Sequence, residues 1–416
     1  RKEAALPLPF VVSRYLRPFL QNNEAGVARR VYDNGVTGRV EQVDALEDAL
    51  LQALWDEDTA EAALLPLLLT HGQAAVQAAL LALHGRALLF ERHADADELW
   101  RQMRTRGCPD VPFVDQVELT NRCPMHCPFC PRGVPGRMAR PTGMMDLALF
   151  QRLLLQLPKG QADHRPLELH HLGESLLHPQ VAQFVAAASQ AGVPTEMSVN
   201  PALLTPPLAQ ALLAAGIHRL VLSLDGIDDG TLVAIRGPAA RYSRAAPNID
   251  ALLAQVAARG QDAPRIVIQM IDLAANRGQQ ADFLRRYGTT GLPTVTAYVK
   301  PLDGPDPTAG DGAGQGGQTG AYLCSYPSQS VVVLWDGRVV PCCRDDDARL
   351  VLGDLNQQTL AQIWAGPAAR DLRRRHRGDA FPAGHLCQGC AWGRPAFVAA
   401  HRLRHPGRAV AAPLQW

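Results

Sequence analysis

The 416-residue sequence predicts an α/β fold over residues 112–302, arranged as a partial (β/α)6 barrel of the TIM type. Short apolar runs alternate in this region with segments whose apolar residues recur at helical spacing. Repeated strand–helix units require parallel strands joined by right-handed crossovers, and about six such units build a partial barrel. Because functional residues of parallel barrels lie at the C-terminal ends of strands, the chemistry is expected in the segments that follow each strand.

Each predicted strand of the barrel is a short, mostly apolar run, as buried parallel strands are. The strands are expected at residues 114–119, 167–171, 195–199, 219–224, 266–271 and 294–299. Between them, apolar residues stand three or four positions apart, which is the spacing of one helix face. Helices are therefore expected at residues 147–157, 181–191, 208–215, 249–258 and 281–287.

Residues 1–105 form a separate N-terminal unit by composition and pattern. A β-hairpin is expected over residues 27–43, with its turn near Asn34-Gly35, a pair favoured in two-residue hairpin turns. Three helices and a short strand follow, at residues 45–55, 60–71, 73–84 and 85–90. This order predicts a small winged-helix-like domain. The alternative is a helical accessory domain that only packs on the barrel.

The region after the barrel begins with a predicted linker and continues as a small C-terminal domain. Residues 303–320 are rich in Gly, Pro and Asp and nearly free of apolar residues, which indicates a flexible linker. In the domain expected over residues 321–400, two β-rich runs flank Asp336-Gly337. An Asp-Gly pair between two such runs is a strong hairpin signal.

Charge and cysteine usage exclude several classes of protein. The sequence has 41 Lys and Arg against 40 Asp and Glu, so the basic run at residues 370–377 indicates a solvated helix face, and no nucleic-acid partner is expected. No apolar run approaches about 18 residues and no signal-peptide pattern is visible, so no membrane partner is expected. Nine cysteines, an odd number in clusters, fit reduced thiols in a cytoplasmic protein better than a disulfide framework.

Cys123, Cys127 and Cys130 form a C-x3-C-x2-C triplet directly after the first predicted strand of the barrel. A [4Fe–4S] cluster normally takes four thiolates, so three thiolates leave one iron open to a small molecule. The competing interpretation is part of a zinc site, although a closed zinc site needs a fourth ligand. The triplet resembles the signature of the radical SAM superfamily. That resemblance implies that the open iron binds S-adenosylmethionine (SAM), whose reductive cleavage releases a 5′-deoxyadenosyl radical.

A second resemblance to the superfamily follows the second predicted strand. Leu172-Gly173-Glu174-Ser175 occupies the place of the family's G-G-E-P, where the family binds the SAM amino group. Glu174 supplies the acceptor that an ammonium needs, and Gly173 allows close approach of the backbone. The sequence departs from the family at Leu172 and Ser175, two positions that act mostly through their backbone. The alternative for Glu174 is a solvated loop carboxylate.

Residues at later strand ends match further positions that contact SAM in the superfamily. They are Ser198, Asn200, Ser223, Asp225 and Arg236, together with Phe129, which stands where the family places an aromatic ring against adenine. Ser223-Leu224-Asp225-Gly226 resembles the family's S-[ILV]-D-G, and an arginine at position 236 often pairs with the SAM carboxylate there. The alternatives are strand-end capping for Ser198 and Asn200, a structural ion pair for Asp225 and Arg236, and loop packing for Phe129.

A second set of cysteines lies near the C-terminus: Cys324, Cys342, Cys387 and Cys390. Their order along the chain resembles the SPASM/twitch extension of radical SAM enzymes in a short form with one auxiliary [4Fe–4S] cluster. Four thiolates also suit an all-cysteine zinc site, so this alternative stays open. Cys343 is a possible substitute for Cys342, because neighbouring residues of a strand face opposite ways. Cys343 and Cys108 are then spare.

These patterns together predict a radical SAM enzyme that removes a hydrogen atom from its substrate. The N-terminal unit loosely resembles the PqqD-like peptide-recognition domain, which implies oxidation, cross-linking or epimerisation of a ribosomally made peptide. The alternatives are a dehydrogenase of a small molecule, such as a sugar or aminocyclitol, and a non-enzymatic iron–sulfur or zinc protein. A carrier such as flavodoxin or ferredoxin is the expected electron donor.

Overall fold

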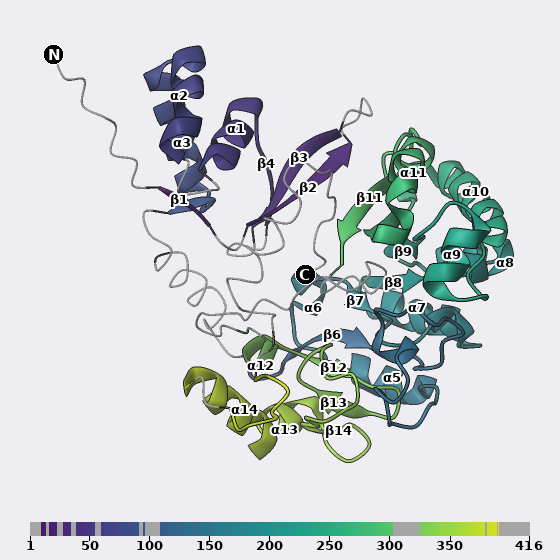
Figure 1. Ribbon diagram of the computed structural model, residues 1–416. Coiled ribbons are helices and arrows are strands. Elements are labelled where there is room, and N and C mark those ends of the chain that lie inside the picture. Colours follow the sequence, from purple (N-terminus) through teal and green to yellow (C-terminus); the bar gives the residue numbers. More distant parts are fainter. Residues whose placement is uncertain are drawn as a thin grey trace.

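The computed structural model describes most of the chain (Figure 1). Its described residues are 10–13, 16–22, 28–34, 39–54, 60–90, 95, 109–302, 324, 326–378, 381–388 and 390. The predicted linker at residues 303–320 and the spare Cys108 lie outside these residues.

The centre of the molecule is a nine-stranded sheet in the order β11-β10-β9-β8-β7-β6-β12-β13-β14. Six strands, from β6 to β11, are parallel and stand in sequence order, which confirms the expected α/β fold. Their bounds are β6 (Phe113–Val117), β7 (Leu167–Glu168), β8 (Thr195–Val199), β9 (Arg219–Ser223), β10 (Arg265–Asp272) and β11 (Val295–Pro301).

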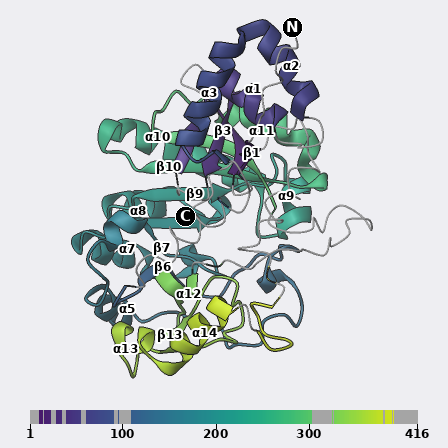
Figure 2. The same ribbon diagram turned by 90° about the vertical axis from the view of Figure 1, so that its left-hand side faces the viewer.

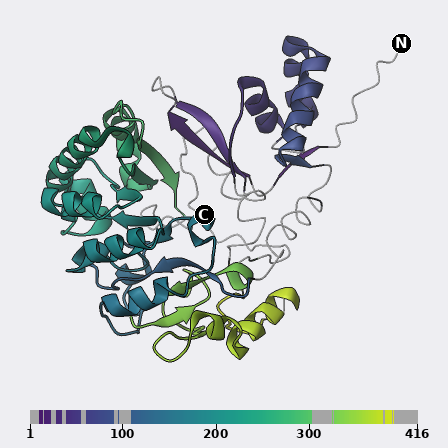
Figure 3. The ribbon, with the colours of Figure 1, turned by 180° about the vertical axis from the view of Figure 1, so that it is seen from behind.

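Helices cover the outer face of the curved sheet (Figures 1 and 3). They are α5 (Leu147–Leu154), α7 (Val181–Gln190), α8 (Pro206–Ala214), α9 (Asp229–Arg236), α10 (Tyr242–Arg259) and α11 (Gln280–Tyr287), while the short α6 (Gln161–His164) lies at the end of the sheet before β7. Helix α9 was not predicted from the sequence, and α10 begins about seven residues before its predicted start. Pro247 lies inside α10, where a proline normally breaks a helix, but Ala245, Ile249 and Leu252 bury one continuous face around it.

Every second residue of the barrel strands packs in the core beneath the helices. Examples are Met197 and Val199 of β8, and Leu220 and Leu222 of β9, all at most 2% exposed. Because successive side chains of a strand point to opposite faces, the residues between them face the inner side of the barrel. The outer face is therefore apolar and carries the fold, whereas the inner face is free to carry chemistry.

The C-terminal region continues the same sheet. Strand β12 (Ser330–Val333) pairs parallel to β6, then antiparallel to β13 (Arg338–Val340), which in turn pairs with β14 (Gly353–Asp354). The predicted hairpin is confirmed, with Gly337 in its turn at φ +91°, where glycine is favoured. Helices α12 (Tyr326–Gln329), α13 (Leu360–Trp364) and α14 (Pro367–Gly378) complete the region and share the barrel's core.

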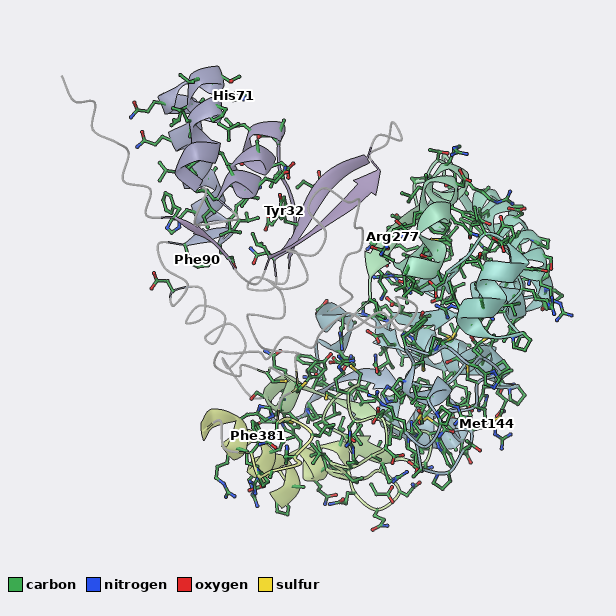
Figure 4. All side chains as sticks on the ribbon, viewed as in Figure 1. Tyr32, His71, Phe90, Met144, Arg277 and Phe381 are labelled. Carbon is green, nitrogen blue, oxygen red and sulfur yellow. The ribbon has the colours of Figure 1, made fainter. Side chains whose placement is uncertain are left out.

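The N-terminal region has a hydrophobic core of its own, built mainly from leucines. It contains β1 (Val11–Val12), β2 (Leu16–Asn22), β3 (Ala28–Asn34), β4 (Arg39–Gln42), α1 (Ala45–Ala53), α2 (Ala60–His71), α3 (Gln73–Gly85) and β5 (Leu89–Phe90). Tyr32 of β3, labelled in Figure 4, donates from its hydroxyl to Asp48 of α1 at 2.6 Å. Figure 2 shows this unit from the side.

The three helices and the antiparallel pair β3–β4 match the predicted helices and hairpin. Strand β2, which pairs with β3, was not predicted. The winged-helix assignment and the exact domain boundaries stay predictions. Strand β2 lies beside β11, so this unit touches the far edge of the barrel sheet (Figure 1). No single helix among the described residues is long and apolar enough to span a membrane, although the bent pair Leu64–His71 and Gln73–Gly85 passes the same test of length and composition.

A buried ion pair joins the barrel to the C-terminal region. Arg140 binds both carboxylate oxygens of Glu118 at 2.6 and 2.5 Å, and both side chains are at most 2% exposed. Arg140 Nε also donates to the backbone oxygen of Asp346, and the Arg140 backbone N–H donates to Asp347. The pair therefore links the end of β6, the loop after the cysteine triplet and the loop after β13.

We expect Arg140→Met to lower the free energy of unfolding by about 3–5 kcal/mol, because it leaves the Glu118 carboxylate buried without a partner. Chemical denaturation monitored by circular dichroism measures this loss. The matched control is Arg285→Met, which breaks an exposed pair with Asp282 and should change stability by less than about 0.5 kcal/mol. Equal effects of the two substitutions would contradict the role given to Arg140.

Candidate functional site

The cysteine triplet lies in a tight loop that follows β6 at the C-terminal edge of the barrel. Backbone hydrogen bonds from Cys130 N to Cys127 O (3.1 Å) and from Gly133 N to Cys130 O (2.9 Å) fold this loop on itself. A Cβ on Gly133 would lie 2.1 Å from Cys127 O, so the turn requires glycine. A further hydrogen bond, from His126 N to Arg236 O (2.9 Å), ties the loop to the end of α9.

The thiols of this loop are partly shielded from water. Burial raises the pKa of Cys123 to about 12, and burial also raises the pKa of Cys127, against the opposing charge of Arg236. The thiolate is the form that binds metals, so these thiols need a positively charged partner to ionise at neutral pH. Soft iron centres are such a partner, and three thiol donors in one loop fit a cluster with an open iron.

The described residues contain no three His, Cys, Asp or Glu side chains close enough together to hold a single metal ion. A cubane cluster takes one thiolate per iron atom, so its ligands stand farther apart than those of a single ion.

Glu174 lies fully inside the site, next to the triplet loop. Its Oε2 accepts from Asn200 N at 2.8 Å, its Oε1 accepts from Leu176 N at 3.1 Å, and its own N–H donates to Arg122 O. Burial raises the pKa of Glu174 to about 7 despite the two backbone donors. The carboxylate is therefore held in place and lacks a cationic partner of its own, which fits an acceptor for an ammonium group. The alternative of a solvated loop carboxylate is wrong.

Gly173 brings two backbone segments together. A Cβ at this position would lie 1.9 Å from Thr120 O and 2.9 Å from Asn121 Cα. Only glycine allows the segment after β7 to lie against the segment before the cysteine triplet. This contact fixes the position of Glu174 relative to the triplet loop.

Asp225 and Arg236 form a buried ion pair. Arg236 binds Asp225 Oδ2 through Nε and Nη2, each at 2.6 Å, while Asp225 Oδ1 accepts from Ile271 N at 2.8 Å. The guanidinium carbon also lies 5.8 Å from the ring centre of Phe129. The structural ion pair named as the alternative is therefore present. The same pair places the Arg236 guanidinium close to Cys127 and Cys130, where its charge favours thiolate ligands.

Asn200 and Ser198 end β8 with different partners. Asn200 Oδ1 accepts from Ala202 N and caps the short helix η3 (Pro201–Leu203), which is the capping role named as the alternative. Its Nδ2 contacts Met125 Sδ at 3.3 Å, inside the triplet loop. Ser198 Oγ lies 3.2 Å from Ser223 Oγ on the inner face of the barrel. The site thus brings Asn200 to the cysteines and directs Ser198 toward the barrel interior.

Sequence reasoning missed Asn276. Its Nδ2 donates to the backbone oxygens of Asp225 and Ile271, both at 2.9 Å, and the side chain is fully buried. Asn276 therefore clamps the segment that carries Asp225. The signal for it was weak, because a single asparagine after β10 belongs to no spaced motif.

Four of the C-terminal cysteines, Cys324, Cys342, Cys387 and Cys390, lie near one another. Burial raises the pKa of Cys342, and the neighbouring thiols of Cys343, Cys324 and Cys387 raise it further. Burial likewise raises the pKa of Cys387 to about 12, with Cys324 and Cys390 beside it. Four thiol groups thus gather at one end of the C-terminal region.

Cys343 lies on the other side of the strand end. Burial raises its pKa and Arg344 opposes that change, while Glu168 of β7 is among the groups that act on it. Its sulfur lies 4.0 Å from the hydroxyl oxygen of Tyr326. The thiols of Cys324 and Cys387 thus act on Cys342, whereas Glu168 and Arg165 of the barrel act on Cys343, which favours Cys342 as the ligand.

We expect Gly173→Ala to weaken SAM binding at least about tenfold, because its Cβ would push Glu174 away from the triplet loop. Isothermal titration calorimetry on anaerobically reconstituted protein measures this affinity. Gly278→Ala is the matched control, since nothing lies within 4 Å of a Cβ at that position. Unchanged SAM affinity in Gly173→Ala would contradict the assignment of this contact.

Comparisons with known proteins agree with this geometry. Residues 117–256 match the radical SAM superfamily, and residues 324–391 match SPASM, an iron–sulfur cluster-binding domain. S-adenosyl-L-methionine-dependent 2-deoxy-scyllo-inosamine dehydrogenase of Niallia circulans is 24% identical over 284 residues, which cover 66% of this chain and 91% of the relative. PqqA peptide cyclase of Xanthomonas oryzae pv. oryzae is 25% identical over 307 residues, which cover 66% of this chain and 78% of the relative.

Among solved structures, Streptococcus suis SuiB bound to S-adenosylmethionine aligns with a TM-score of 0.49 and 12% identity, covering 87% of this chain and 90% of SuiB. The two matched domains imply a [4Fe–4S] cluster with SAM in the barrel and auxiliary iron–sulfur binding in the C-terminal region. The chain is a radical SAM enzyme with a SPASM iron–sulfur cluster-binding domain.

Proposed function

We propose that this enzyme oxidises its substrate by removing two hydrogens in total, one as a hydrogen atom and one as a proton and an electron. The observation that carries this proposal is the second set of four cysteines, which lies in the C-terminal region whose hairpin continues the barrel sheet. An oxidation needs an electron acceptor close to the substrate, and this set is where one would be held. Epimerisation would instead need a hydrogen-atom donor, for which Cys343 is the candidate on the barrel side.

Cys123, Cys127 and Cys130 are the proposed ligands of the catalytic cluster. When bound there, a [4Fe–4S] cluster together with SAM supplies a 5′-deoxyadenosyl radical able to take a hydrogen atom from a C–H bond. The protein holds and orients these groups. Glu174 accepts from the SAM ammonium, Gly173 admits the close backbone approach, and Asp225 holds Arg236 next to the thiolates.

Four further residues near the triplet loop and on the inner face are proposed to contact SAM. Asn200 stands beside the triplet loop through Met125, which supports a contact to SAM in addition to its capping role. Phe129 lies in the triplet loop and packs near Arg236, which supports an adenine contact. Ser198 and Ser223 face the barrel interior and are proposed at the border between SAM and substrate.

The substrate we propose is a ribosomally made peptide, held in part by the N-terminal unit. This unit exposes large apolar side chains on its helices: Leu65, Leu69 and Leu81 are 56%, 79% and 56% exposed. Exposed apolar side chains on neighbouring helices suit binding of another polypeptide. The second candidate is a small hydroxylated amine, which the polar inner face of the barrel favours. A flavodoxin or ferredoxin is the proposed electron donor, in the cytoplasm.

The proposed oxidation predicts a mass loss of two hydrogens from the true substrate. The reconstituted enzyme is incubated without oxygen with SAM and dithionite, and with either the peptides encoded beside its gene or 2-deoxy-scyllo-inosamine. Mass spectrometry then reads the substrate, and chromatography reads 5′-deoxyadenosine. Cys123→Ala should lower formation of 5′-deoxyadenosine more than about 100-fold, because the cluster loses a ligand.

A product with unchanged mass and inverted stereochemistry would show that the reaction is an epimerisation and would contradict the proposed oxidation. Absence of 5′-deoxyadenosine from protein with intact clusters would overturn the proposed reaction itself.

The proposed ligands of the auxiliary cluster are Cys324, Cys342, Cys387 and Cys390. We expect Cys342→Ala to lower bound iron by about four atoms per chain, the content of one [4Fe–4S] cluster. Cys343→Ala is the matched control and should leave the iron content unchanged. Iron and sulfide analysis, with electron paramagnetic resonance of the reduced protein, makes the comparison. Loss of iron from Cys343→Ala alone would reverse the assignment.

A further inference from the structure

The inner face of the barrel carries many polar groups. The strand residues that alternate with the helix-packed core include the apolar Val221, Val267 and Ile271, but the others carry hydroxyl, amide, imidazole and charged groups: Gln116, Glu168, His170, Glu196, Ser198, Arg219, Ser223, Gln269, Tyr298 and Lys300. These polar groups alternate with the apolar residues that pack beneath the helices, so packing against the helices does not require them.

Hydrogen bonds join many of these groups into a belt across neighbouring strands. Tyr298 donates to Gln269 Oε1 at 3.2 Å, and Gln269 Nε2 donates to Ser223 Oγ at 3.2 Å. Ser223 Oγ lies 3.2 Å from Ser198 Oγ. The Ser198 N–H in turn donates to His170 Nδ1 at 3.2 Å. The belt thus runs from β11 to the end of β7 and holds its members in fixed orientations.

Charged side chains form a second group on the inner face, next to the belt. Gln116 Nε2 donates to Glu168 Oε2 at 2.5 Å, and Arg165 lies 3.8 Å from Glu168 Oε1. On the neighbouring strands, Arg219 Nε lies 3.2 Å from Glu196 Oε2. Glu168 thus has partners at both of its oxygens, whereas the Glu196–Arg219 pair meets through a single oxygen.

This pair has free hydrogen-bonding capacity although it is buried. Glu196 is only 2% exposed, yet its Oε1 has no hydrogen-bond partner, and Arg219 Nη2 has none either. A buried polar atom without a partner is destabilising, so such a pair is incomplete as it stands. Glu196 Oε1 offers an acceptor and Arg219 Nε and Nη2 offer donors, and a hydroxyl is the group that donates to the first and accepts from the second.

The charge of the inner face is balanced. Glu168 and Glu196 stand against Arg219 and Lys300, and burial lowers the pKa of His170, which keeps this ring neutral. A balanced surface does not select a strongly charged ligand by its net field. The polar belt beside the pair instead suits a ligand with several hydroxyl groups.

We propose that Glu196 and Arg219 form the specificity-determining contact for a hydroxyl group of the substrate, so that the substrate is an alcohol or polyol at the position held in the barrel. This inference rests on the proposed function in placing the substrate on the inner face, where it would extend from the SAM contacts at the strand ends to the first residues of β8 and β9. Two sources supply the same chemistry: a hydroxylated ring such as an aminocyclitol, and a hydroxylated side chain of a peptide.

The test measures binding to the reconstituted, SAM-loaded full-length enzyme by isothermal titration calorimetry. The probes are 2-deoxy-scyllo-inosamine, cyclohexylamine as the ring without hydroxyls, and a candidate precursor peptide with its Ser and Thr residues present or replaced by Ala. We expect the hydroxylated form of one probe pair to bind at least about tenfold more tightly than its counterpart. Which pair shows the difference identifies the source.

Glu196→Gln should weaken binding of that hydroxylated probe by about 10- to 100-fold and leave SAM affinity unchanged, because one charged hydrogen-bond partner is lost. Thr195→Val is a matched control on the same strand: Thr195 Oγ1 is also buried without a partner, but it belongs to the opposite face. Thr195→Val should bind the probe as the unchanged enzyme does.

Equal binding of the hydroxylated and hydroxyl-free probes, binding of neither, or equal effects of Glu196→Gln and Thr195→Val would overturn this inference. Formation of 5′-deoxyadenosine by the same samples reports separately on the proposed reaction. A failure there, with hydroxyl-dependent binding retained, would overturn the reaction and leave the binding contact standing.

Discussion

The pair between Glu118 and Arg140 is the interaction on which the arrangement of the two cysteine sets depends. Glu118 stands just beyond β6, between the barrel strand and the triplet, and Arg140 lies in the loop after the triplet. The remaining donors of Arg140 reach the loop that follows Cys342 and Cys343. A buried guanidinium is tolerated only when its donors are satisfied, and here they are satisfied by Glu118 and by the backbone oxygen of Asp346. The two sites therefore cannot shift independently without leaving charge buried and unpaired.

Close backbone approach is the second constraint, and it acts at a shorter range. Gly173 against Thr120 and Gly133 against Cys127 each bring chain segments nearer than any side chain would allow. These contacts fix the position of the Glu174 carboxylate relative to the three thiols without help from a ligand. Such preorganisation lowers the ordering that binding must impose on the protein. It also explains why the polar groups around the triplet are mostly fixed by backbone donors and acceptors rather than by other side chains.

The barrel strands were predictable because buried parallel strands are continuous apolar runs, and the positions of the cysteine triplet, Gly173 and Glu174 just beyond strands were predictable because these residues lie in local motifs. Contacts between distant parts of the chain were not. The parallel pairing of β12 with β6 and the hydrogen bonds from Arg140 to Asp346 and Asp347 join residues more than 200 positions apart, and no local pattern encodes them. Helix α9 was missed because it is short and begins with Asp229-Gly230, which is typical of a turn. Asp225 and Arg236 matched a motif, yet only the structure shows them bound to each other.

The outer side of the barrel strands packs under the helices, whereas the inner side is available for contacts with the substrate. This division affects which positions can determine substrate specificity. The outer positions are apolar and pack under the helices, so their change would cost stability. The inner positions contribute little to that core, so they are free to differ between relatives that share the fold. A dehydrogenase of an aminocyclitol and a peptide cyclase each match this chain at about a quarter of aligned positions, which shows how far the sequence can diverge around one chemistry. In our proposal the substrate is selected on the inner face, where Glu196 Oε1 and Arg219 Nη2 are buried without a hydrogen-bond partner among the described residues.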